Sequence, residues 1–255
     1  EVNLTVVEIG PRMVPRMLGE KAGGLLQSWC ESKGVTVHTN TQVKAIESTT
    51  DELQVVLESG QICPADVVIV STGVKPRVHY LESCDIQVDQ GIVVDDHMQT
   101  NQPDVYAAGD CAQGLDFSTG ETAVHAVQPT ATEHGRVAAA NMVGGNNLPY
   151  KGSLNMNILD TLGLITCSFG AWEGVAGGDS AERYSPDNHQ YVNLQFKGDV
   201  LVGANSVGYH EHLGVLRGLI ETQMPLGEWK DRLKENPVGL VDAYQGVNQA
   251  ALQNG

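Results

Sequence analysis

The sequence lacks any apolar run approaching the roughly 20 residues that a membrane-spanning helix needs. With a hydrophobic fraction of 41% and 29 glycines, the composition is instead typical of a soluble α/β protein with many turns. The 255 residues suffice for one or two domains. Because the chain opens with EVNLTVVE, without an initiator methionine or a basic and then apolar leader, we expect neither an export signal nor a membrane partner.

Cysteine pairs of the C-x-x-C type are also absent. The five cysteines are scattered along the sequence, and an odd number without such spacing suits neither a disulfide framework nor a zinc site. Reduced thiols are typical of the cytoplasm, which is where we expect the protein to reside. His210, Glu211 and His212 suggest a metal site, but alternate residues share a helix face poorly and no third ligand is evident. We therefore predict no metal.

Basic residues are scarce. Lysine and arginine total 15 against 31 aspartates and glutamates, which gives a formal charge of −16. A field of this sign repels polyanions at long range, so the composition argues against nucleic acid and anionic membranes as partners. The same charge weakly disfavours an acidic electron-carrier protein, although a local basic patch would override it.

A glycine-rich G-x-G-x-x-G loop is missing as well, although the first 38 residues have the pattern of a βαβ unit. The apolar run Leu4 to Val7 and the segment Val35 to His38 predict strands. Between them, a helix is indicated by apolar residues at helical spacing: Ala22, Leu25, Leu26, Trp29 and Cys30. In a dinucleotide-binding βαβ unit, an acidic residue about 20 positions past the glycine loop binds the ribose. Glu8 has that position, so we expect the loop upstream of residue 1; the alternative is that Glu8 is a solvated strand end.

Further strands are indicated downstream. Three short segments, Val43 to Ile46, Leu53 to Leu57 and Gln61 to Cys63, predict an antiparallel meander. Asp66 to Val70 predicts another strand, which leads into Ser71-Thr72-Gly73. Val78 to Cys84 predicts a short helix and Gly91 to Val94 a strand.

The most informative stretch reads TNQPDVYAAGDCA and spans residues 100–112. Val105 to Ala108 predict a short buried strand that runs directly into Gly109 and Asp110. In an open parallel sheet, ligands bind outside the carboxyl ends of the strands. A carboxylate offers only acceptors, so Asp110 would suit the vicinal hydroxyls of a nucleotide cofactor. Alternatively, Asp110 only caps the next helix.

After a polar loop, Gln128 to Met142 predict a helix with Pro129 in its first turn. The glycine and asparagine cluster Gly144 to Asn147 indicates a boundary. Strands are then expected at Leu154 to Phe169, Tyr191 to Phe196 and Val200 to Val207. Helices follow at Leu213 to Thr222 and Leu226 to Lys234, and the polar residues from Tyr244 are expected to be loose.

The motif T…D-V-Y-A-A-G-D closely resembles the second flavin-binding motif of the FAD-dependent pyridine nucleotide oxidoreductases. This family includes NADH oxidases, rubredoxin and ferredoxin reductases, and the NADH-binding part of assimilatory nitrite reductases. Three neighbouring segments are similar to the family in the same order: residues 4–34, the T-G-V-K-P stretch, which is similar to A-T-G-x-x-P, and QPTATEHGRVAAANMVGG. In the family this last segment is the helix under the isoalloxazine.

The resemblance implies roles for six residues. Gly109 and Asp110 would hold the ribityl chain of FAD, and Val127 and Gln128 would contact the flavin ring. Glu8 would bind the ribose of NADH and repel the 2′-phosphate of NADPH, although Arg12 and Arg16 nearby could accommodate that phosphate. Gly73 would lie close to the nicotinamide dinucleotide. The six predicted site residues are Glu8, Gly73, Gly109, Asp110, Val127 and Gln128.

We therefore predict an α/β fold in three parts: residues 1–74 as a partial Rossmann-like NAD(H) domain, 75–146 as the second half of a split FAD domain, and 147–255 as an α+β interface domain. The resemblance implies a flavoprotein oxidoreductase that takes hydride from NADH to FAD and passes electrons to an unidentified acceptor. No residue stands out as a catalytic acid, base or nucleophile.

The predicted partners are a missing N-terminal half of the FAD domain, from the same gene or a separate chain, and a second copy bound through the C-terminal domain. The chain alone should bind both cofactors poorly. Two other functions stay open: a cofactor-free dimerisation or assembly module, and an NAD-binding regulatory domain without flavin.

Overall fold

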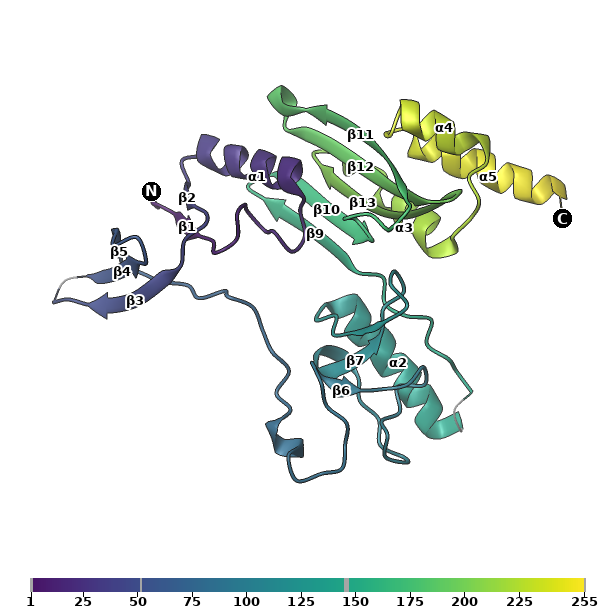
Figure 1. The fold of residues 1–255 in the computed structure, drawn as a ribbon, viewed down its shortest axis with the longest axis horizontal. Helices are drawn as coiled ribbons and strands as arrows, with labels where there is room; N and C mark the ends of the chain where they lie inside the picture. Colours follow the sequence, from purple (N-terminus) through teal and green to yellow (C-terminus); the bar gives the residue numbers. More distant parts are fainter. Residues whose placement is uncertain (1, 51, 145–146, 255) are drawn as a thin grey trace. The chain divides into compact units, whose positions relative to one another are not determined.

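The computed structural model describes residues 2–50, 52–144 and 147–254. The chain forms two compact units (Figure 1), one made of residues 1–71 and 156–255 and the other of residues 72–155. Both units combine helices with sheets, so the predicted α/β class is confirmed. No helix within these ranges combines the length and apolarity needed to cross a membrane.

The first unit begins with the predicted βαβ arrangement. Strand β1 (Thr5–Val7) pairs in parallel with β2 (Thr36–His38), and helix α1 (Glu20–Ser32) connects them. The helix ends where Gly34 adopts φ +85° and its amide donates to the carbonyl of Glu31. All five apolar residues that predicted this helix by their spacing lie within α1.

Strands β3 (Val43–Ser48), β4 (Leu53–Leu57) and β5 (Ile62–Ala65) form the expected antiparallel meander. The predicted strand at Asp66 to Val70 is wrong, because these residues form no strand and Ile69 is 83% exposed. An interior strand requires neighbours on both edges. Within the described ranges, the β1–β2 sheet has only two strands, so it has no position between two neighbours for a further strand.

The remainder of the first unit contains a five-stranded antiparallel sheet in the order β11-β12-β13-β10-β9. Its strands are β9 (Met156–Thr161), β10 (Leu164–Gly170), β11 (Asp179–Ser185), β12 (Gln190–Lys197) and β13 (Val200–Val207). The segment expected as one strand from Leu154 to Phe169 is a hairpin. It turns where Leu162 and Gly163 both adopt positive φ. Strand β11 was not predicted.

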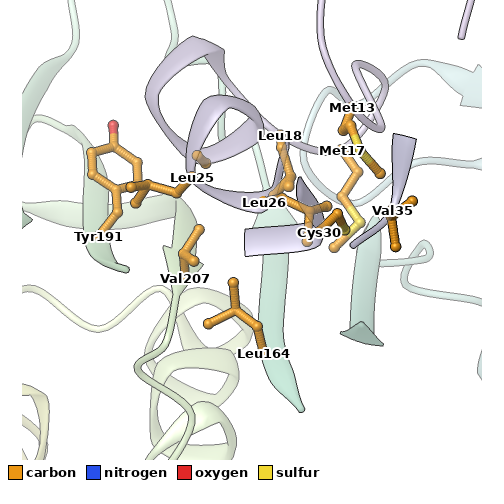
Figure 2. Packing of buried hydrophobic residues seen from close by; sticks show 11 residues of the cluster. Met13, Met17, Leu18, Leu25, Leu26, Cys30, Val35, Leu164, Tyr191 and Val207 are labelled. Carbon is orange, nitrogen blue, oxygen red and sulfur yellow. The ribbon is translucent and has the colours of Figure 1, made fainter. Parts of the chain in front are cut away.

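Helix α1 packs on one face of this sheet. Leu25 and Leu26 of α1 share a buried cluster with Leu164, Tyr191 and Val207 of the sheet (Figure 2). Side chains alternate between the faces of a strand. Leu194 and Phe196 lie an odd number of residues after Tyr191 on β12, so their side chains point to the opposite face. Both are fully buried, so that face is covered too.

Three helices follow the sheet: α3 (Leu213–Thr222), α4 (Glu228–Glu235) and α5 (Leu240–Asn254). Helices α3 and α4 contact β13 and β11, respectively, and α5 packs on both helices (Figure 1). The expectation of a loose segment from Tyr244 is wrong. Ala243 and Val247 are buried one turn apart, so the polar composition concealed a narrow apolar stripe.

The second unit is built around helix α2 (Gln128–Gly144), as predicted within two residues. Val137 and Ala138 of α2 form a buried cluster with Ile92, Met98 and Ala112, among others. The short elements of this unit are η1 (His79–Leu81), β6 (Ile92–Val93), η2 (Gly109–Cys111), β7 (Ala112–Leu115) and β8 (Thr122–Ala123).

Two expectations in this unit are wrong. Val105 to Ala108 form only one bridge, between Tyr106 and Gln99, in place of a strand. The polar loop expected after Asp110 contains the hairpin β7–β8, because Ala112 and its neighbours are buried against the cluster around α2. Two residues of the predicted boundary, 145 and 146, lie outside the described residues.

Candidate functional site

The chain presents Asp110 from a single 3₁₀ turn, η2. Ala108 before it is extended, and Gly109 adopts φ +76°, a conformation that glycine reaches without the penalty of a side chain. A Cβ added to Gly109 would lie 3.5 Å from the Cβ of Ala131. The turn therefore lies directly against the first turns of α2.

The carboxylate of Asp110 is exposed. Within the described part of the chain it engages in no hydrogen bond or ion pair, and the element after the turn is strand β7. The alternative that Asp110 caps a following helix is therefore wrong. An exposed carboxylate at the end of a fixed turn can accept hydrogen bonds from the hydroxyl groups of a ligand.

The start of α2 lies beside this turn. The amide of Ala131 donates to the carbonyl of Val127 at 3.1 Å, so the regular helical bonding begins there and Pro129 contributes no donor. The preceding amides and the positive end of the helix dipole are directed toward the beginning of the helix. Val127 is half-buried and Gln128 is exposed. The structure thus brings four predicted site residues together: Gly109, Asp110, Val127 and Gln128.

A buried histidine connects these two elements, and the sequence did not reveal it. His134 of α2 is 1% exposed, and its Nδ1 accepts the amide of Gly109 over 3.4 Å. Its ring lies perpendicular to that of Tyr150, with ring centroids 4.8 Å apart. Burial and then the nearby His125 lower the pKa of His134, while Glu133 acts in the opposite direction. The imidazole is therefore neutral at physiological pH.

A histidine and an aspartate lie in close contact near the other end of the loop that precedes α2. Nε2 of His125 is 2.8 Å from Oδ2 of Asp116, and both side chains are largely buried. The other carboxylate oxygen of Asp116 accepts the amides of Ser118 and Thr119. Burial alone would raise the pKa of Asp116, but His125 and these amides outweigh it and lower the pKa. The pair attaches the β7–β8 turn to the segment leading into α2.

The second candidate position, Glu8, lies in the other unit at the end of β1. Its backbone amide continues the pairing with β2 by donating to the carbonyl of His38 at 2.8 Å. Its Oε1 accepts the amide of Gly10 at 2.7 Å, which fixes the carboxylate against its own loop. The side chain is only half-buried, so the other oxygen has access to a ligand.

The two arginines beside Glu8 differ in their surroundings. Arg12 donates through Nε to the carbonyl of Leu18 at 2.7 Å and through Nη2 to that of Pro15 at 3.4 Å. It therefore stabilises the loop before α1. Arg16 is exposed and has no hydrogen-bond or ion-pair partner among the described residues. Of the two, Arg16 has the freer guanidinium.

Gly73 belongs to an extended, exposed segment at the start of the second unit. It adopts φ +99°, which only glycine reaches easily. The structure thus explains the residue type at this position, and its predicted role beside a dinucleotide stays a prediction.

One group of three potential metal ligands occurs in the described ranges: Asp95, Asp96 and His97. Nδ1 of His97 pairs with Asp96 at 2.6 Å, and one oxygen of Asp95 accepts the amides of His97 and Gln99. These contacts belong to a local turn, and the turn explains why the three side chains lie close together. The segment 210–212 forms no such group in this part of the chain.

Comparison with known proteins identifies a family model and relatives that match half or most of the chain. The family model described as pyridine nucleotide-disulphide oxidoreductase matches residues 1–130. The epsilon subunit of an NADH-dependent phenylglyoxylate dehydrogenase from Aromatoleum evansii is 30% identical over 239 residues, which cover 93% of this chain and 56% of the relative. A rubredoxin-NAD(+) reductase from Pseudomonas putida is 35% identical over 119 residues, 46% of this chain and 31% of the relative.

Among solved structures, an NAD-dependent persulfide reductase from A. fulgidus matches with a TM-score of 0.79 and 29% identity. The match covers 89% of this chain and 46% of that protein. This chain therefore spans about half the length of the phenylglyoxylate dehydrogenase subunit and of the persulfide reductase.

Proposed function

Because the chain belongs to the pyridine nucleotide-disulphide oxidoreductase family, we propose that it forms part of a flavoprotein that passes a hydride from NADH to FAD and electrons on to a further acceptor. The family and the relatives use FAD and NAD(H). When bound, the two cofactors supply the redox chemistry. The residues of this chain bind and orient them. The observation that carries the proposal is the exposed, unpaired carboxylate of Asp110 beside the start of α2.

The residues around Asp110 suit a flavin. Asp110 would accept hydrogen bonds from the ribityl hydroxyls, because a carboxylate has acceptors only. The amides at the start of α2, near Val127 and Gln128, would stabilise negative charge on the pyrimidine edge of the reduced ring. Gly109 would allow the turn from which Asp110 reaches the cofactor, since its φ of +76° is one that residues with a side chain rarely adopt.

Glu8 would bind the ribose of NADH through the oxygen that Gly10 leaves unused. A 2′-phosphate would meet the negative charge of this carboxylate. Arg12 is already bound to backbone carbonyls, so of the two nearby arginines only the exposed Arg16 could pair with that phosphate, against the charge of Glu8. We therefore propose a preference for NADH over NADPH. Gly73 would lie near the dinucleotide.

In this proposal, residues 1–74 belong to the NAD(H) domain, 75–146 to the FAD domain and 147–255 to an interface domain that forms a homodimer. A further polypeptide segment would complete both cofactor sites, and the acceptor is unassigned. The second candidate function is a dimerisation or assembly module without cofactor. The absence of any G-x-G in the sequence favours it, since such a loop grips the cofactor pyrophosphate.

The test replaces Asp110 by Asn in the full protein that contains this chain. The FAD content of the purified protein is read from its flavin absorption, and the FAD affinity is measured by titration. Hydrogen bonds to a charged acceptor contribute about 1.5–3 kcal/mol, so losing this charge should weaken FAD binding by at least tenfold. The exposed Asp85, which lies outside the motif, is the control: Asp85→Asn should leave binding unchanged. Equal FAD affinities for the two variants, or a protein that never contains flavin, would contradict the proposal and favour the assembly module.

A further inference from the structure

The buried His134 has no role in the function proposed so far. Its Nδ1 accepts the amide of Gly109 over 3.4 Å, while its Nε2 is buried and has no partner among the described residues. A neutral imidazole has one donor and one acceptor nitrogen. Since Nδ1 is the acceptor here, Nε2 holds the proton.

The ring of His134 is held in place on several sides. The perpendicular ring of Tyr150 lies against it, and the hydroxyl of Tyr150 hydrogen-bonds Ser153. A Cβ added to Gly114 on β7 would come within 3.4 Å of both Cε1 and Nε2. Neighbouring groups thus restrict the imidazole to an orientation in which Nδ1 meets the amide of Gly109.

We propose that His134 is a positioning residue for the flavin site: its neutral imidazole fixes the amide of Gly109 and so maintains the left-handed turn from which Asp110 reaches the cofactor. This inference rests on the proposed function. Gly109 separates Asp110 from the extended segment, so rotation of this one peptide would redirect the carboxylate. The hydrogen bond links the turn to α2, the other element of the proposed flavin site.

The same arrangement predicts a dependence on pH. Protonation converts Nδ1 from an acceptor into a donor, which directs two N–H groups at each other and breaks the bond to Gly109. The charged and titratable groups facing His134 are His125 from the preceding loop, Glu133 on α2 and Tyr150 after α2. Because burial and His125 lower the pKa of His134 from 6.5, the bond is intact at neutral pH and is lost only as the pH falls below 6.5.

Two variants in the full protein test this inference. His134→Gln retains an acceptor and does not titrate, so FAD affinity at pH 7.5 should stay within about threefold of the parent. His134→Leu removes the acceptor, and FAD affinity should fall about tenfold. Between pH 7.5 and 5, the affinity of the parent should decline and that of His134→Gln should decline less. Because His125, Glu133 and Tyr150 are unchanged in this variant, the difference between the two profiles reports His134.

A second measurement does not depend on flavin. Hydrogen exchange of the Gly109 amide, corrected for its intrinsic pH dependence, should be faster in His134→Leu than in the parent, and faster in the parent at pH 5 than at pH 7.5. Exchange unaffected by both changes would overturn the inference, as would equal FAD affinities for His134→Leu and the parent. If Asp110→Asn also leaves FAD binding unchanged, the proposed function itself fails. An effect of Asp110→Asn without one of His134→Leu rejects only the role of His134.

Discussion

Asn205 on β13 gives the sharpest prediction for stability. Its Oδ1 accepts the amide of Gly19 at 3.0 Å, and its Nδ2 donates to the carbonyls of Met17 at 2.9 Å and Cys167 at 3.2 Å. The side chain is 2% exposed. The bonds to Gly19 and Met17 attach the loop that precedes α1 to the five-stranded sheet, and the bond to Cys167 joins β13 to β10 within that sheet. The segment after Glu8 is thereby connected with the C-terminal part of the same unit.

Replacing Asn205 by Ala removes all three hydrogen bonds. Each contributes about 1 kcal/mol net, and a buried group left without a partner costs about 1–3 kcal/mol. We therefore expect the free energy of unfolding of the first unit to fall by about 3 kcal/mol. At about 2–4 °C per kcal/mol for a domain of this size, the midpoint of thermal unfolding should fall by about 6–12 °C.

Tryptophan fluorescence is the appropriate assay. The three tryptophans of the chain, Trp29, Trp172 and Trp229, all lie in the first unit, so their emission during urea titration reports the unfolding of that unit alone. Asn188→Ala is the matched control, because Asn188 is exposed and, among the residues that the structure describes, its side-chain amide bonds Ser185 alone. Its free energy of unfolding should change by no more than about 0.5 kcal/mol. Equal unfolding midpoints for the two variants would refute the role of Asn205.

Two further predictions concern packing and thiol chemistry. A Cβ added to Gly246 on α5 would lie 2.2 Å from the indole of Trp229, so Gly246→Ala should lower the free energy of unfolding by about 1–3 kcal/mol. Gly24→Ala, at a position of α1 with open space around it, should raise it by up to about 1 kcal/mol. Urea titration compares both variants with the parent, and a Gly246→Ala variant as stable as the parent would contradict the packing. Cys84 is exposed, whereas burial raises the pKa of Cys167 to about 12. Alkylation at pH 8, followed by mass spectrometry, should therefore modify Cys84 first, and equal rates would show that Cys167 is accessible.

The spacing of apolar residues predicted those helices and strands whose buried face is visible in their own sequence. Helix α1 was predicted because its apolar residues recur at helical spacing and Gly34 ends it. Strand β11 was missed because it is an edge strand with one buried apolar residue, Ala181, among polar neighbours. The segment Asp66 to Val70 failed for the opposite reason. Its apolar composition is that of an interior strand, but strand formation depends on partners that no local pattern encodes.

The candidate site was predictable only in part. The motif ending in Asp110 and the helix beginning at Gln128 were both visible in the sequence, and the fold places them side by side. The histidine between them was not visible, because His134 meets Gly109 from 25 residues away. His134 is one of several polar residues in α2, and nothing in the sequence indicates which of them contacts a distant backbone amide. Only the packing of α2 on η2 reveals it.

The energetics of His134 argue that its role is positioning and not stability. Its one hydrogen bond, at 3.4 Å, is long and contributes no more than about 1 kcal/mol, while its buried and unpartnered Nε2 costs about 1–3 kcal/mol. The two contributions at best cancel, so an apolar side chain of similar size would stabilise the second unit equally well. His134→Leu should therefore change the unfolding of this unit little while it weakens flavin binding. The separation of these two effects is what distinguishes a residue that fixes the Gly109 turn from one that only fills the core.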